Sequence, residues 1–208
     1  MKKGFYLLTA ILLFYTAKSQ TKSIDVVLNG NKYNIEISKD SPVTMVARNS
    51  RHRLFFTKTF PVPAGAYSSY GFVTASNKLY FINSYNFGGS GSLDNTYCLI
   101  MRGNSLICIP VYKGGELNLT AYNKNGNDII VFEGIWDIKN GESHFQDHRY
   151  RIVRYEFKNE SFVKVIHGKT IYKYPSLDDE NISLMNVFKD IKRKEPSLLK
   201  SINPSEYK

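Results

Sequence analysis

Residues 23–39 have the sequence SIDVVLNGNKYNIEISK, and the pattern of this stretch recurs through much of the chain. Apolar and polar residues alternate on both sides of Asn29-Gly30, as they do in strands that bury one face. Asn-Gly between two alternating runs predicts a β-hairpin, because both residues tolerate the positive φ of a tight turn. The alternating apolar residues are Ile24, Val26, Leu28, Tyr33, Ile35 and Ile37.

Downstream of residue 72 this alternation returns, with a turn signal about every ten to fifteen residues. The chain holds 15 Tyr and 13 Phe, a bias that favours strands. We therefore expect a mainly β fold, an antiparallel meander arranged as a sandwich, a barrel or a partial propeller-like sheet. Residues 40–70, which contain three prolines, are expected to form a long connection with one strand near residues 54–57. Further strands are expected at residues 78–85, 96–101, 106–112, 116–122, 128–133, 149–157 and 162–171.

The C-terminal part departs from this pattern and predicts one α-helix, over about residues 178–194. Four apolar residues between Ile182 and Ile191 are spaced as on one helix face. Ser176 and the acids at 178–180 suit the N-terminus of a helix, and Lys192-Arg193-Lys194 suits its C-terminus. We expect this helix to dock on a sheet through its apolar stripe.

The N-terminal segment has the order of a secretory signal peptide. Met1-Lys2-Lys3 is positively charged, residues 4–15 are an apolar run, and Ala17-Lys18-Ser19 places small residues before a cleavage point. The apolar run is shorter than the roughly 20 residues of a membrane-spanning helix. We expect residues 1–19 to be removed. The mature chain is then one β-rich domain, residues 20–208, without a transmembrane segment and secreted or periplasmic.

The formal net charge is +10, and it becomes +7 when Lys2, Lys3 and Lys18 leave with the signal peptide. Loose basic clusters occur at residues 48–53, 149–154 and 189–194. An exported protein meets few nucleic acids, so the charge favours an acidic glycan or a protein in the cell envelope as the partner, or serves solubility alone.

Cys98 and Cys108 flank a predicted turn at Arg102-Gly103-Asn104. A three-residue loop would place them directly opposite each other, as a possible disulfide in an oxidising compartment. A two-residue turn would shift the register by one and place them on opposite faces as free thiols. The sequence leaves both arrangements open.

Residues suited to catalysis or metal binding are few and scattered. His144, Asp147 and His148 cluster in a predicted loop, where the spacing carries little information. Gly89-Ser90-Gly91 lacks the frame of a nucleophile elbow. We expect no cofactor and no metal site. If the chain is a hydrolase acting on an envelope polymer, its catalytic residues are Glu133, Asp137, His144 or His148.

Aromatic residues in predicted loops are the better candidates for a binding surface, because exposed rings stack on sugars and anchor protein partners. Basic residues beside them would add charge to the contact. The predicted binding residues are Tyr67, Tyr70, Phe87, Trp136, Arg149 and Arg151.

Two stretches resemble the repeats of FG-GAP/VCBS proteins, which are exported propeller-like proteins. One is residues 79–91, with Phe87-Gly88-Gly89, and the other is residues 121–131, which is similar to the family's calcium loop. The first acid of that loop is Ala121 here, and the remaining candidate ligands, Asn123 and Asn125, are neutral amides. Calcium sites normally include carboxylates, so we expect this site to be lost. The resemblance implies a role in binding without chemistry.

The expected function is therefore a non-catalytic binding or interaction protein of the cell envelope. Two alternatives remain. One is the hydrolase described above, and the other is an inhibitor or immunity protein against a secreted enzyme. The latter would use a protruding loop, for which residues 86–96 and 134–148 are the candidates.

Overall fold

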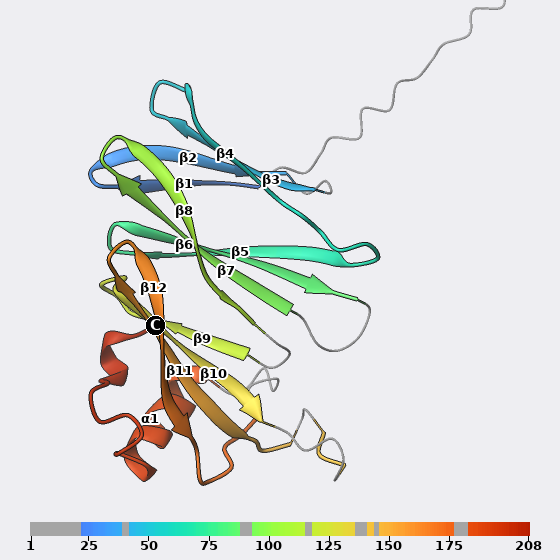
Figure 1. Cartoon of the computed structure of the whole chain (residues 1–208), viewed down its shortest axis with the longest axis vertical. Helices are drawn as coiled ribbons and strands as arrows, with labels where there is room; N and C mark the ends of the chain where they lie inside the picture. Colours follow the sequence, from blue (N-terminus) through green and yellow to red (C-terminus); the bar gives the residue numbers. More distant parts are fainter. Residues whose placement is uncertain are drawn as a thin grey trace, which may run out of the picture.

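The computed structural model describes residues 22–38, 42–87, 93–114, 118–135, 141–143, 146–176 and 183–208. The predicted signal peptide lies outside these residues. The described strands form three four-stranded antiparallel sheets, each made of four strands in chain order (Figure 1). Sheet A contains β1 (Lys22–Leu28), β2 (Asn31–Ile37), β3 (Val43–Asn49) and β4 (Leu54–Phe60). Sheet B contains β5 (Tyr67–Ala75), β6 (Lys78–Asn86), β7 (Leu93–Arg102) and β8 (Ser105–Lys113). Sheet C contains β9 (Asn118–Tyr122), β10 (Asp128–Ile135), β11 (Arg149–Lys158) and β12 (Ser161–Lys169).

The mainly β meander predicted from the sequence is confirmed, and the described strands close no barrel. The hairpin at residues 23–39 is β1–β2, with φ of 50° at Asn29 and 77° at Gly30. The strand predicted near residues 54–57 is β4, but the long connection predicted around it is wrong, because β3 and the start of β5 also lie within residues 40–70. The alternation Val43-x-Met45-x-Ala47 is that of a strand with one buried face, but the nearby prolines obscured it.

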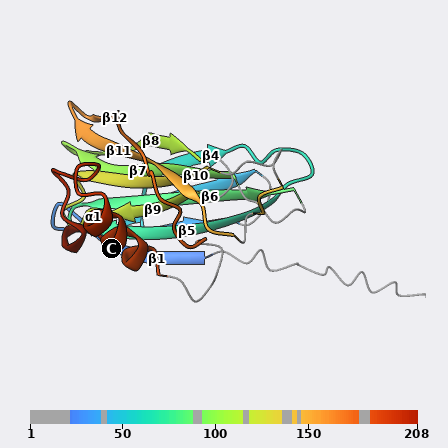
Figure 2. The same ribbon diagram turned by 90° about the horizontal axis from the view of Figure 1, so that it is seen from below.

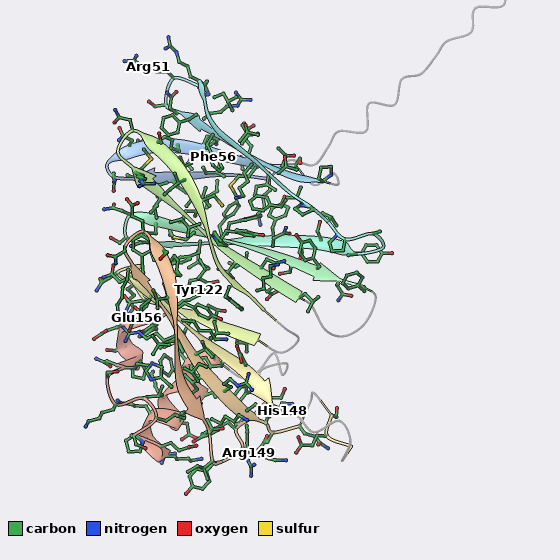
Figure 3. All side chains as sticks on the ribbon, viewed as in Figure 1. Arg51, Phe56, Tyr122, His148, Arg149 and Glu156 are labelled. Atoms are coloured by element: carbon green, nitrogen blue, oxygen red, sulfur yellow. The ribbon has the colours of Figure 1, made fainter. Side chains whose placement is uncertain are left out.

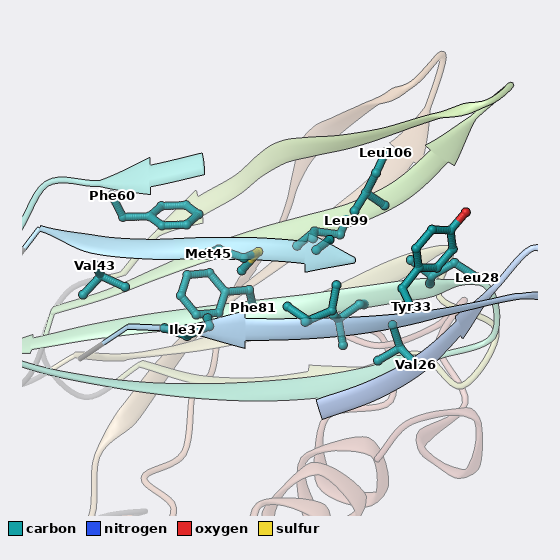
Figure 4. Close-up of a cluster of buried hydrophobic side chains, with 13 residues drawn as sticks. Val26, Leu28, Tyr33, Ile37, Val43, Met45, Phe60, Phe81, Leu99 and Leu106 are labelled. Carbon is teal, nitrogen blue, oxygen red and sulfur yellow. The ribbon is translucent and has the colours of Figure 1, made fainter. Parts of the chain in front are cut away.

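The sheets are stacked face to face, and their strands run in broadly the same direction (Figures 1 and 2). One apolar cluster lies between sheets A and B, where Phe81 and Leu99 of sheet B face Met45 of sheet A (Figure 4). A second cluster, around Tyr80 and Ile129, lies between sheets B and C. Because sheet C is covered on both faces, the first five residues of β10 (DIIVF) are all buried and the alternation disappears.

The helix α1 (Leu184–Lys194) covers the outer face of sheet C, with Val187, Phe188 and Ile191 buried. It begins after an extended Ser183, later than predicted, and residues 177–182 lie outside the described part of the chain. A short 3-10 helix, η2 (Pro204–Glu206), follows. Neither of these described helices is long and apolar enough to cross a membrane.

The two cysteines are free, and the possible disulfide does not form. The β7–β8 turn has two residues, so Cys98 is opposite Ile109 and Cys108 is opposite Leu99. Side chains one position apart in register point to opposite faces. Cys98 is accordingly in the cluster shared with sheet C, and Cys108 packs toward sheet A.

Candidate functional site

Three hairpin tips meet at one end of sheets A and B. They are the β1–β2 turn, the loop between β3 and β4, and the β7–β8 turn, which all lie on the same side of the molecule (Figure 1). Between them is a cavity of about 320 Å³, which we call the tip cavity. Its lining residues are Asn29, Asn31, Lys32, Tyr33, Asn49, Ser50, Arg51, Arg53, Phe55, Met101, Gly103 and Asn104.

The charge of the tip cavity is entirely positive. Lys32, Arg51 and Arg53 are exposed, and none of the described residues that line the cavity is acidic. No ion pair joins these three cations to a carboxylate in the part of the chain that the structure describes. Arg102, by contrast, precedes the β7–β8 turn and pairs with Glu160 at 2.8 Å. Three cations that form no ion pair with a described carboxylate make a site for an anion.

The loop that carries the two arginines is held by Asn49. The Oδ1 atom of Asn49 accepts the backbone N–H of Arg51 at 3.0 Å and that of Arg53 at 3.1 Å. The backbone of Asn49 also exchanges hydrogen bonds with the loop, donating to Arg53 at 3.1 Å and accepting from His52 at 2.8 Å. His52 adopts a φ of 57°, a conformation that costs energy in a residue other than glycine. These bonds fix the loop backbone before any ligand binds.

The inner wall of the tip cavity is aromatic. Tyr33 and Phe55 pack with ring centroids 5.1 Å apart, and Met101 reaches the same wall from sheet B. The amides of Asn29, Asn31 and Asn104 lie around the rim. An aromatic wall with amide and guanidinium groups around it can contact a sugar ring and hydrogen-bond its hydroxyl and carboxylate groups.

The structure does not gather the six predicted binding residues into one site. Tyr67 and Tyr70 lie on β5 and not in a loop, and they share a hollow of about 560 Å³ with Lys22. Tyr67 is 77% exposed, whereas Tyr70 packs partly against the core between sheets A and B. Phe87 is exposed directly after β6, next to the residue paired with Tyr67. Trp136 lies outside the described residues.

The two predicted arginines lie on sheet C, far from these tyrosines in the stack. Arg149 is exposed at the end of the long axis opposite Arg51 (Figure 3). Arg151 pairs with Glu133 across β10 and β11 at 3.2 Å. Arg151 therefore serves at least in part to hold the sheet.

The residues predicted for a hydrolase are likewise not gathered into one site, and two of them lie outside the described residues. Glu133 is engaged by Arg151, and His148 is buried, with its backbone paired to Tyr174. Asp137 and His144 lie outside the described residues. The tip cavity and the β5 hollow are lined by other side chains.

The stretch that resembles a calcium loop, residues 121–131, forms an ordinary turn between two strands. The Oδ1 atom of Asn123 accepts the backbone N–H of Asn125 at 2.8 Å, which closes the turn between β9 and β10. Over the described ranges, no group of three or more His, Cys, Asp and Glu side chains gathers as a metal site would require.

In the sequence, Arg51 and Arg53 stand out only as part of a loose basic cluster, and no pattern marks Lys32, Asn49 or Phe55 as binding residues. The stretch Asn49-Ser50-Arg51-His52-Arg53 does contain a usable signal, because asparagine followed by polar residues is typical of a tight loop. What it lacks is any indication that the β7–β8 turn, some fifty residues later, closes the cavity.

No family model, no curated protein and no solved structure matches this chain.

Proposed function

We propose that the chain is an exported, non-catalytic binding protein of the cell envelope, and that it binds an acidic polysaccharide in the tip cavity. The observation that carries the proposal is the convergence of Lys32, Arg51 and Arg53 on a cavity whose described lining has no acid. The signal-like N-terminus and the positive net charge support export and an anionic partner. The FG-GAP/VCBS resemblance points to the same class of function.

The shape of the site favours a glycan over the surface of an acidic protein. The cations surround a concave space of about 320 Å³ with an aromatic wall, which suits one unit of a chain molecule. A protein partner would require a broad surface, of about 800 Å² on each side. A uronic acid offers the carboxylate that arginine binds with two parallel hydrogen bonds.

The test compares three polymers by calorimetry at low and moderate salt: polygalacturonate, neutral dextran and poly-L-glutamate. Polygalacturonate is expected to bind and dextran is not. Arg51→Ala/Arg53→Ala is expected to weaken polygalacturonate binding about 100-fold, because two charge-assisted contacts are lost. The matched control is Lys169→Ala/Lys200→Ala, which removes the same charge from exposed positions elsewhere.

Equal losses in the two double variants would show that binding follows net charge alone and would refute the site. Binding of poly-L-glutamate in preference to polygalacturonate would favour a protein partner, as expected of an inhibitor. Hydrolysis of polygalacturonate during the titration would support the hydrolase alternative.

A further inference from the structure

A second hollow, of about 300 Å³, adjoins the tip cavity on sheet A. We call it the side hollow. It shares Lys32, Tyr33, Asn49 and Ser50 with the tip cavity, so the two meet where β2 begins and β3 ends. A ligand that fills the tip cavity has its next unit within reach of the side hollow.

The chemistry of the side hollow differs from that of the tip cavity. Val27 is 53% exposed and supplies an apolar surface. Asp25 supplies a carboxylate, whose Oδ1 atom accepts from Asn34 Nδ2 at 2.7 Å. The remaining lone pairs of Asp25 can accept a hydrogen bond from a ligand. Asp25 offsets the charge of the shared Lys32, so a second carboxylate is held less well in the side hollow than in the tip cavity, where Lys32, Arg51 and Arg53 face no acid among the described residues.

We infer that the two hollows bind consecutive units of a polysaccharide in which a uronic acid alternates with a neutral N-acetylated sugar. This inference rests on the proposed function. The uronate occupies the tip cavity against Arg51 and Arg53. The neutral unit occupies the side hollow, where its acetyl methyl group packs on Val27 and its amide N–H donates to Asp25. A polymer with an acid on every unit meets Asp25 with the wrong charge.

The test uses hexasaccharides of equal length: a hyaluronan fragment, with alternating glucuronate and N-acetylglucosamine, and hexagalacturonate. The hyaluronan fragment is expected to bind at least about tenfold more tightly, because only hexagalacturonate places a carboxylate beside Asp25. Asp25→Asn is expected to raise the affinity for hexagalacturonate and so to reduce this preference to less than about threefold. The matched control is Glu36→Gln, which removes a half-buried acid of β2 that lies outside both hollows and pairs with Arg48 at 3.7 Å.

Equal affinity of the unaltered chain for the two hexasaccharides would overturn the inference while leaving the proposed function intact. The same holds if Asp25→Asn leaves the preference unchanged, or if Glu36→Gln changes it as much. Failure of both acidic hexasaccharides to bind would instead overturn the proposed function.

Discussion

The arginines of the tip cavity and two arginines of sheet C, Arg151 and Arg154, are surrounded by opposite kinds of neighbours. Arg51 and Arg53 project from a loop, without a carboxylate partner among the described residues. Arg154 is about three-quarters buried and donates to Asp128, and it also pairs with Glu156 at 3.0 Å. A cation matched to a carboxylate contributes to the fold. A cation that is held in place but has no carboxylate partner remains available to bind an anionic ligand.

The two regions also hold their arginines by different means. In sheet C a carboxylate fixes the guanidinium directly, whereas at the tip Asn49 fixes the backbone and leaves both guanidinium groups in solvent. Substitutions in sheet C should therefore change stability. Those at the tip should change binding more than stability.

The largest expected effect is that of Asp128→Ala. Asp128 is 1% exposed and accepts hydrogen bonds from Arg154 and from the Tyr207 hydroxyl, which ties the C-terminal residues to sheet C. Its removal leaves the Tyr207 hydroxyl without its acceptor and the partly buried guanidinium with Glu156 alone, and we expect the free energy of unfolding to fall by about 3 kcal/mol. Chemical denaturation measures this change, with the exposed Asp25→Ala as the control. A loss no greater than in that control would show that the pair contributes little to the fold.

The comparison also shows where sequence reasoning succeeds. The β1–β2 turn follows from Asn29-Gly30, because positive φ at both positions is a local property. The β11–β12 turn at Asn159-Glu160 has positive φ at both residues as well, and it falls between the strands expected at residues 149–157 and 162–171. Whether Cys98 and Cys108 are opposite each other depends on whether the turn between them has two or three residues, and the sequence leaves this open.

The site itself depends on contacts that no local pattern encodes. The role of Arg151 depends on its being opposite Glu133, and this register is known only once β10 and β11 are paired. The tip cavity likewise requires that Gly103 and Asn104 of sheet B approach the end of sheet A. The tract Pro63-Ala64-Gly65-Ala66 favours a loop that would include Tyr67 and Tyr70, but its turn closes at Ala66 and β5 begins at Tyr67.

A smaller effect is expected from Asn49→Ala, which tests whether the loop is held before binding. It removes the acceptor for two backbone N–H groups, and we expect the free energy of unfolding to fall by about 1 kcal/mol, since the loop is exposed. The affinity for polygalacturonate should fall several-fold, because the two arginines lose their fixed backbone. Denaturation and calorimetry on one preparation measure both quantities.

Asn49→Asp separates the effect on stability from the effect on affinity for polygalacturonate. The aspartate keeps the acceptor oxygen, so stability should return, but its negative charge lies in the tip cavity and should keep the affinity low. If Asn49→Ala left the affinity unchanged, the ordering of the loop by this side chain would have no role in binding.

The smallest expected effect concerns His167 on β12, close to the paired arginine of sheet C. Burial, with the charge of Arg154, lowers the pKa of His167 from its ordinary value of 6.5. The unfolded chain then binds this proton more readily than the folded protein, so the free energy of unfolding should decrease as the pH falls below about 6.5. The carboxylate of Glu156, whose pKa is lowered first by its bond to Lys158, affects stability only below about its ordinary pKa of 4.5. The two effects therefore occupy separate pH ranges.

Denaturation between pH 7 and pH 5 isolates the histidine. His167→Gln should reduce the slope of stability against pH in this range, and His52→Gln, at the exposed tip loop, is the matched control. If the slope of stability against pH is unchanged in His167→Gln, protonation of His167 does not contribute to the pH dependence of stability. A reduced slope would show that burial beside Arg154 disfavours the charged form of His167, whereas the open tip tolerates Lys32, Arg51 and Arg53 together because water screens them.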